Sequence, residues 1–194
     1  MYSLQTSVQV GQASFRIRND GDFRTVLDCF EVLNDEELDE TERLYAALVI
    51  FYEDFDTLGD LFVHRDILDQ LQLGMYRFFN CGEQELKSNT NEHKLVDWKK
   101  DSNIICAAVN NVAKCEVRSL EYLHWWTFFG YYMSVGESVL SNVVSIRYKI
   151  AHNEKLEKYE RKFREDNPEY FNIDLRSKEQ KEAEDYIKNL WFTG

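Results

Sequence analysis

Residues 120–132 form the run Leu120-Glu121-Tyr122-Leu123-His124-Trp125-Trp126-Thr127-Phe128-Phe129-Gly130-Tyr131-Tyr132. Seven of the eleven residues from Tyr122 to Tyr132 are aromatic. Aromatic side chains bury large areas, so this run is expected to organise the core. Within it, residues three or four apart share one side of a helix. We therefore predict a buried structural stripe made of Leu123, Trp126, Phe129 and Met133.

The segments around this run also have helical spacing. The chain has 194 residues, 44% of them hydrophobic, with only 8 Gly and 1 Pro, and this balance favours helices over a turn-rich β fold. Asp39 and Glu42 match a capping box, and Cys81-Gly82 matches a helix end. Apolar periodicity predicts helices over about 23–34, 39–52, 66–79, 102–114, the aromatic run capped by Ser119, 137–167 and 177–190.

The N-terminal segment has a different period. Residues from Thr6 to Arg18 alternate between apolar and polar positions around Gly11-Gln12, which predicts two short strands joined by a turn. An isolated hairpin is marginally stable in water, so we expect it to pack on the helices that follow. The predicted fold is mainly α: a compact helical domain with a short N-terminal β-hairpin and a charged C-terminal helical extension.

The predicted domain boundary falls near residue 150. Residues 1–150 are expected to form the helical core domain, with a mobile polar loop at 83–94, and residues 151–194 the charged extension. Beyond Ile150 the long helix keeps only a one-sided apolar stripe, which fits a projecting arm or a helix packed on one side. Whether the C-terminal helix docks on its own domain or on a partner stays open. The partner-binding candidates are Leu156, Tyr159, Phe163, Tyr186, Ile187, Leu190, Trp191 and Phe192.

Charge is strongly segregated along the chain. The net charge is -12, and the segment from Asp20 to Asp60 alone contains 14 acidic and 2 basic residues. An acidic face disfavours a phosphate backbone, and no Lys or Arg occurs between Glu121 and Glu137 to support a stacking platform for single strands. We therefore expect no nucleic-acid partner. The acidic segment is interpreted as a solvated helix face, with a basic protein partner as the alternative.

No motif predicts catalysis or a bound cofactor. The chain lacks a Gly-rich phosphate loop, a G-x-S-x-G elbow and an H-E-x-x-H pair, and its four Cys and four His have no zinc-site spacing. The Cys residues are expected to be reduced, mostly core thiols, and His124 a structural histidine. No apolar run is long enough to span a membrane and no secretion signal is evident, so the protein is expected to stay where it is made.

Several strings together resemble one protein family. They are Ser7-Val8-Gln9-Val10-Gly11 with Phe15-Arg16-Ile17, Asp22-Phe23-Arg24, Met75-Tyr76-Arg77-Phe78-Phe79-Asn80-Cys81-Gly82-Glu83, Asp97-Trp98-x-x-Asp101 before Ile104-x-Cys106-Ala107-Ala108, and Leu123-His124-Trp125-Trp126-x-Phe128 with Ile146-Arg147. Their order and spacing over roughly residues 7 to 175 are similar to the tail assembly chaperones of tailed, siphovirus-type phages of Gram-positive bacteria. These proteins are encoded just ahead of the tape-measure protein.

The resemblance implies a role without catalysis, metal or cofactor. It implies a chaperone that binds and solubilises the helical tape-measure protein in the host cell cytoplasm and is absent from the mature virion. The tail tube protein and a second copy of the chain are further candidate partners. Two alternatives stay open, namely a structural subunit of the particle associated with the tail tube or connector, and an acidic regulator that binds a basic host protein.

Overall fold

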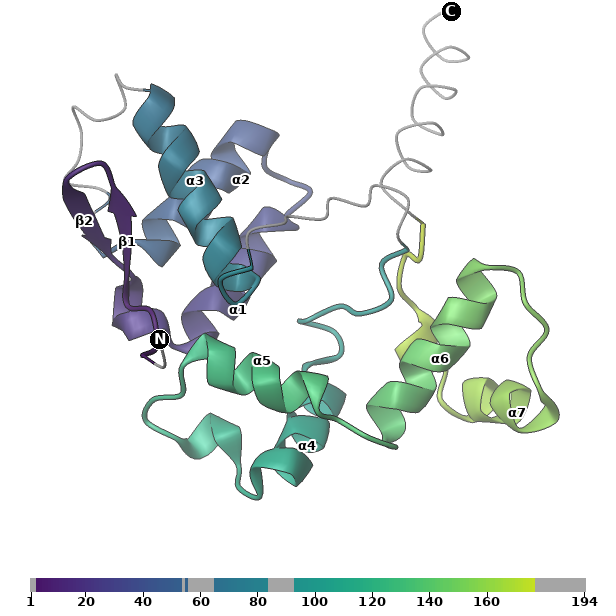
Figure 1. Ribbon diagram of the computed structural model, residues 1–194. Helices are drawn as coiled ribbons and strands as arrows, with labels where there is room; N and C mark the ends of the chain where they lie inside the picture. The colour runs from purple at the N-terminus through teal and green to yellow at the C-terminus, as the bar shows by residue number, and fades with distance from the viewer. Residues whose placement is uncertain (1–2, 54, 56–64, 84–92, 177–194) are drawn as a thin grey trace, which may run out of the picture. The chain divides into compact units, whose positions relative to one another are not determined.

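The computed structural model describes residues 3–53, 55, 65–83 and 93–176 (Figure 1). These residues form seven α-helices and one two-stranded antiparallel sheet, which confirms the mainly α prediction with an N-terminal hairpin. The elements are β1 (Ser7–Val10), β2 (Ala13–Arg16), α1 (Phe23–Leu33), α2 (Glu40–Phe51), α3 (Arg65–Phe79), α4 (Ser102–Ala113), α5 (Trp125–Met133), α6 (Val139–Ala151) and α7 (Lys158–Asp166).

The chain divides into two compact units. Unit 1 comprises Met1–Leu86 with Val112–Ser134, and unit 2 comprises Lys87–Asn111 with Val135–Gly194. This division differs from the predicted one at residue 150, because α6 and α7 fall in the same unit. The ion pair between Lys149 of α6 and Glu160 of α7 shows why these helices belong together.

The N-terminal hairpin packs on α3 in unit 1. Val8 pairs with Phe15 across the two strands, and Gly11 adopts a positive φ of 60° at the turn. Val8 and Val10 are buried, and β1 lies against α3 as Figure 1 shows. A Cβ on Gly74 of α3 would lie only 2.4 Å from Val8 Cγ1, so this glycine is what allows the strand to approach the helix. The expectation that the hairpin rests on the helices is confirmed.

The first two helices begin at capping residues, and Arg18, in the turn before α1, bonds the end of α2. The side chain of Asp22 accepts from the backbone N–H of Arg24 at the start of α1, and Asp39 with Glu42 forms the predicted capping box of α2. The guanidinium of Arg18 donates to four carbonyl oxygens at the end of α2, those of Val49, Ile50, Tyr52 and Glu53. These carbonyls have no partner within the helix, so the cation satisfies groups that would otherwise need water.

The predicted long helix over 137–167 is wrong. It is broken between Ala151 and Lys158, where Asn153 adopts a left-handed φ of 56°. The backbone N–H groups of Asn153 and Glu154 donate back to Ile150 and Lys149, which closes the end of α6. Asn tolerates this conformation better than most residues, so the break has a local cause. As a result α7 is not a projecting continuation of α6.

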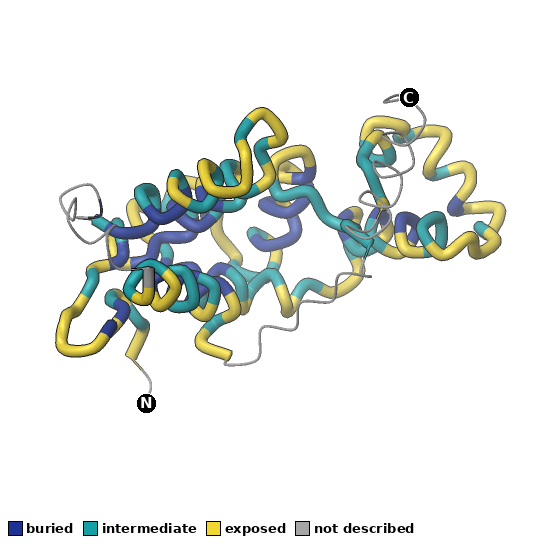
Figure 2. The backbone as a smooth tube through the Cα atoms, turned by 90° about the horizontal axis from the view of Figure 1, so that it is seen from above, coloured by how far each residue is buried: buried dark blue, intermediate teal, exposed yellow. Residues whose placement is uncertain are grey.

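The prediction of which side of the aromatic helix is buried is also wrong. Trp125 and Phe128 are the buried residues of α5, and the Phe128 ring stacks on Phe23 of α1 at a centroid distance of 4.5 Å. Trp126 and Phe129 are half-buried, and Met133 is 67% exposed. The buried face therefore lies one residue, or about 100°, from the predicted one. Figure 2 shows buried residues in dark blue along the helices.

The start of this helix also differs from the prediction. His124, not Ser119, caps α5, and Val117–Ser119 form a separate 3-10 turn. Leu123 precedes the helix and is half-buried. Leu123 is thus held by the junction that leads into α5 and not by a stripe on the helix.

We expect Gly74→Ala to lower the unfolding free energy by about 1–3 kcal/mol, because the added methyl group meets the branched Val8 side chain. Gly130→Ala in α5 is the matched control, since a Cβ added at Gly130 would have no atom within 4 Å. It should raise stability by up to about 1 kcal/mol through helix propensity alone. Chemical denaturation measures both. Equal effects of the two substitutions would contradict close packing of β1 on α3.

Candidate binding surfaces and their supports

The strings Asp22-Phe23-Arg24 and Leu123-His124-Trp125-Trp126 meet in unit 1. The backbone N–H of Phe23 donates to the Leu123 carbonyl at 2.9 Å, and the N–H of Leu123 donates to Asp22 Oδ2 at 2.9 Å. Asp22 is 5% exposed and also binds the Arg24 guanidinium at 3.0 Å. One buried carboxylate thus caps α1, neutralises a cation and fixes the segment that enters α5.

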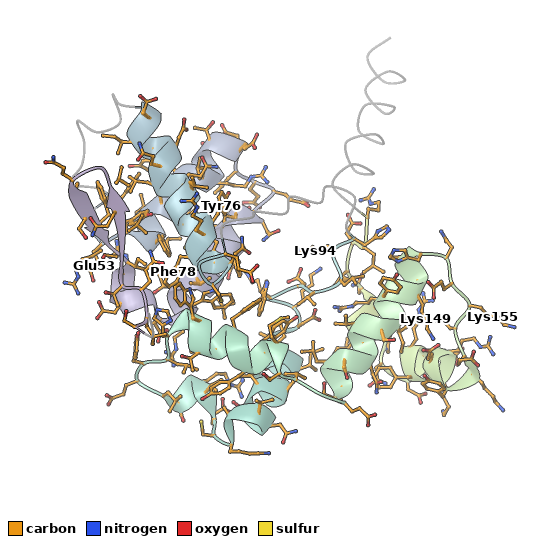
Figure 3. The ribbon with its side chains drawn as sticks, viewed as in Figure 1. Glu53, Tyr76, Phe78, Lys94, Lys149 and Lys155 are labelled. Atoms are coloured by element: carbon orange, nitrogen blue, oxygen red, sulfur yellow. The ribbon has the colours of Figure 1, made fainter. Side chains whose placement is uncertain are left out.

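The C-terminal end of α3 supplies the third part of this junction. Trp125 Nε1 donates to the Phe79 carbonyl and Trp126 Nε1 donates to the Phe78 carbonyl, each at 2.9 Å. Cys81, at a positive φ of 56°, and Gly82 donate to the preceding carbonyls of the same helix end. Figure 1 shows this end of α3 beside α5, and Figure 3 labels Phe78 there. The Trp125 indole therefore pairs the Phe79 carbonyl, and the Trp126 indole adds a second donor to the Phe78 carbonyl, which already accepts from the Cys81 N–H.

His124 completes the junction as a neutral structural histidine. Its Nδ1 accepts from the backbone N–H of Trp126 at 3.1 Å, so the proton resides on Nε2, which donates to the Gln5 carbonyl at 2.9 Å. Burial of the ring lowers the pKa of His124, and this outweighs the opposing effects of the Gln5 carbonyl and the Asp22 carboxylate. The sequence-based expectation of a structural role agrees with this position.

In unit 2 a buried ion pair has the corresponding role. Arg147 of α6 is fully buried, and its guanidinium binds both carboxylate oxygens of Asp101 at 2.6 and 2.9 Å. The remaining donors reach the carbonyls of Leu95 and Tyr170. Asp101 and Arg147 occur in separate strings of the sequence analysis, and their spacing along the chain does not predict that they form a pair. Their donors and acceptors are used within the fold, so this is a structural centre and not a binding site.

The surface around α7 holds the described partner-binding candidates. Tyr159 is 67% exposed, whereas Leu156 and Phe163 are half-buried, and Phe163 packs edge-on against Phe171. The other candidates, Tyr186, Ile187, Leu190, Trp191 and Phe192, lie outside the described residues. Among the described candidates, Tyr159 is thus the one most open to a partner.

A buried carboxylate anchors α7 to α6. Lys149 Nζ lies 2.6 Å from Glu160 Oε1, while Glu160 Oε2 accepts from the backbone N–H of Glu157 at 2.7 Å. The hydrogen bond from Lys149, and after it the one from Glu157, lowers the pKa of Glu160. A hollow of about 380 Å³ beside this helix is lined by Leu156, Arg161, Arg164 and Glu165. Figure 2 shows most of α7 as exposed.

Other kinds of site find no support in the described part of the chain. It contains no group of three or more His, Cys, Asp or Glu side chains that could hold a metal ion. None of its helices combines the length and apolar character needed to cross a membrane. None of the four cysteines, all of which lie in the described residues, forms a disulfide; Cys29 and Cys106 are buried and Cys115 is exposed. Burial, and then the Glu83 carboxylate, raises the pKa of the Cys81 thiol to about 11, so it is protonated at neutral pH.

We expect Arg147→Met to lower the unfolding free energy by about 3–5 kcal/mol, because it leaves the Asp101 carboxylate buried without a counter-ion. The matched control is Lys162→Met, which removes an exposed cation paired with Asp166 and should cost less than about 1 kcal/mol. Adding Asp101→Asn to Arg147→Met should recover part of the loss. A loss no larger than that of the control, measured by chemical denaturation, would argue against this pair as a stabilising centre.

A pH dependence follows from the His124 position. Its folded pKa is lowered, so the unfolded chain binds the proton more readily, and stability rises with pH until the unfolded pKa of about 6.5 is passed. Lowering the pH from about 7 to about 5 should therefore reduce the unfolding free energy. His124→Asn keeps a capping side chain without a titrating ring and should flatten this slope. Identical slopes for both proteins would show that His124 does not titrate between the two states.

Comparison with known proteins places the chain in a family. A family model described as Bacteriophage Gp15 protein matches residues 3–172, which include the hairpin, all seven described helices and both junctions above. No curated protein and no solved structure gives a match. The match covers most of the chain and confirms the resemblance to phage proteins. The chain therefore belongs to the Bacteriophage Gp15 protein family.

Proposed function

We propose that this phage protein is a tail assembly chaperone that binds and solubilises the tape-measure protein during tail morphogenesis, without catalysis. It would act in the host cell cytoplasm and leave before the virion is complete. Membership of the phage family and the resemblance to proteins encoded ahead of the tape-measure protein support this role. A tape-measure protein is a long, largely helical chain that aggregates without a partner, so its chaperone needs surfaces that fit apolar helices.

The observation that carries the proposal is the set of large apolar side chains that the helices leave exposed. Met133 at the end of α5 and Tyr159 on α7 are each 67% exposed, and Val139 and Tyr148 on α6 are nearly half exposed. A helical client can cover such residues through anchors spaced along its own apolar face. In the described residues no buried side-chain donor or acceptor lacks a partner, so the scaffold that presents them is internally satisfied.

Two other roles remain candidates. A structural subunit of the tail tube or connector would expose similar apolar side chains, but it would be retained in the particle in stoichiometric amounts. An acidic regulator would bind a basic host protein through the segment from Asp20 to Asp60, where acidic residues dominate. Quantitative analysis of purified virions separates the first of these from a chaperone, which should be absent or present only in traces.

Co-expression with the tape-measure protein tests the proposed role. We expect the wild-type chain to raise the soluble fraction of the client, and the double substitution Met133→Asp with Tyr159→Asp to reduce that fraction because it places charge where apolar contact is needed. Lys162→Asp, also at an exposed position of α7, is the control and should leave client solubility unchanged. Circular dichroism of each purified variant establishes that it is folded.

Two results would count against the proposal. The first is a client whose solubility does not depend on the wild-type chain. The second is a stoichiometric amount of the chain in finished virions, which would support the structural-subunit alternative.

A further inference from the structure

A row of cations on and beside α7 has no carboxylate partner within the described residues. Lys155, Lys158, Arg161 and Arg164 recur every third residue and are all exposed. In contrast, Lys149 and Lys162 nearby each form an ion pair, with Glu160 and Asp166. Lys158, Arg161 and Arg164 lie on α7 itself, and those that are three residues apart are neighbours on the helix surface. Figure 3 labels Lys155 in the loop between α6 and α7, where its side chain points away from both helices.

This cationic row borders a hollow that a partner can fill. Arg161 and Arg164 line it together with Leu156 and Glu165, so the hollow offers apolar contact and more positive than negative charge. Arg side chains also cover apolar surface with their stems while the guanidinium groups stay available to carboxylates. The four cations of the row stand out in a chain whose net charge is -12. The site therefore fits an acidic helical surface.

The chain carries such a surface on its other unit. From Asp20 to Glu53, all of it described, there are 11 acidic and 2 basic residues. Asp28 and Glu31 lie three apart on α1, and both are exposed. Partial burial, and then the charges of Glu31 and Asp22, raises the pKa of Asp28, so the carboxylates of this face repel one another.

We propose that the cationic row of α7 in unit 2 binds the acidic face of α1 in unit 1 of a second copy of this chain. The two faces differ and belong to different units, so the contact is heterologous and links copies head to tail. Two copies of this negatively charged chain repel each other at long range, but about 0.15 M salt screens this repulsion. Opposite charges that come into contact still attract each other locally. The proposal rests on the chaperone role and deepens it, since linked copies would line a long helical client.

Association of the purified chain without any client is the test, and analytical ultracentrifugation measures it. We expect the average mass to rise above the 23.1 kDa of one chain with increasing concentration. The apparent dissociation constant should increase about tenfold or more between about 50 and 500 mM NaCl. A single-copy mass at every concentration and salt level would overturn the proposal.

Two charge-reversed variants assign the contact to these faces. The basic-face variant carries Arg161→Glu with Arg164→Glu, and the acidic-face variant carries Asp28→Lys with Glu31→Lys. Each alone should weaken self-association about tenfold or more, because like charges then face each other. The acidic-face variant is less negative than the wild type, so general repulsion cannot explain its loss. Lys162→Glu, at a paired position of the same helix, is the control and should have little effect.

Mixing the variants gives the decisive comparison. The intact α7 row of the acidic-face variant can bind the intact α1 face of the basic-face variant, and the two reversed faces can also pair. Association in the mixture should therefore be stronger than that of either variant alone. If the mixture stays dissociated, or if the wild type closes only within one chain and its mass does not depend on concentration, the proposal fails. Salt-sensitive binding of an oligonucleotide by the row, without self-association, would assign the row to nucleic acid and also overturn it.

Failure here and failure of the chaperone role are distinguishable. A chain that stays monomeric but solubilises the tape-measure protein refutes the head-to-tail contact alone. A chain that self-associates through these faces but leaves the client insoluble refutes the chaperone role alone.

Discussion

The carbonyl groups that end α3 are the constraint around which unit 1 is built. The N–H groups of Asn80, Cys81 and Gly82 bond three of these carbonyls locally, and the Phe79 carbonyl takes its donor from α5. Trp125 and Trp126 supply two indole N–H groups at consecutive carbonyls, which fixes both the position and the rotation of α5. With α5 held in this way, Phe128 stacks on Phe23 and His124 fits beside Gly21. A Cβ at Gly21 would lie 2.5 Å from the Phe78 ring, so the turn before α1 has no room for a side chain.

In unit 2 a buried charged side chain, that of Arg147, satisfies backbone carbonyls. Arg147 joins α6 to Asp101 before α4 and to two backbone carbonyls. Leu95 lies in a segment without regular secondary structure, and Tyr170 lies in the short 3-10 helix Pro168–Phe171. A buried ion pair of this kind stabilises a fold only when its remaining donors and acceptors are also paired, as they are here. The Lys149–Glu160 pair then sets α7 against α6 and leaves the outer side of α7 free. Both units thus position their helices by satisfying polar groups at element ends.

Local signals in the sequence predicted the elements that depend on neighbouring residues. The hairpin turn at Gly11, the capping box of Asp39 and Glu42 and the end of α3 at Cys81-Gly82 all involve residues within a few positions of one another. The phase of α5 was not predictable in this way, because every position of that helix except Gly130 and Thr127 is large and apolar and only contacts with Phe23 and Phe79 select the buried side. The partners of Arg18 and Arg147 lie 23 to 52 residues away, beyond any periodicity. Asn153 is a local signal that could have predicted the end of α6, because Asn accepts the left-handed conformation found there.

The α3–α5 junction and the Arg147–Asp101 and Lys149–Glu160 ion pairs of unit 2 hold the helices in place and leave other groups exposed. The proposed binding properties follow from these groups, namely exposed apolar side chains, the acidic face of α1 and the cationic row of α7. The surfaces of unit 1 among them depend on the end of α3, which holds α5 in place. Hydrogen exchange of the Trp125 indole N–H, followed by nuclear magnetic resonance, tests this claim most directly. Trp125 is 1% exposed and bonded to the Phe79 carbonyl, so its indole proton should exchange only when unit 1 unfolds, with the same free energy as the slowest backbone amides of α1 and α3. Exchange at a rate typical of an exposed tryptophan would contradict the junction and the account built on it.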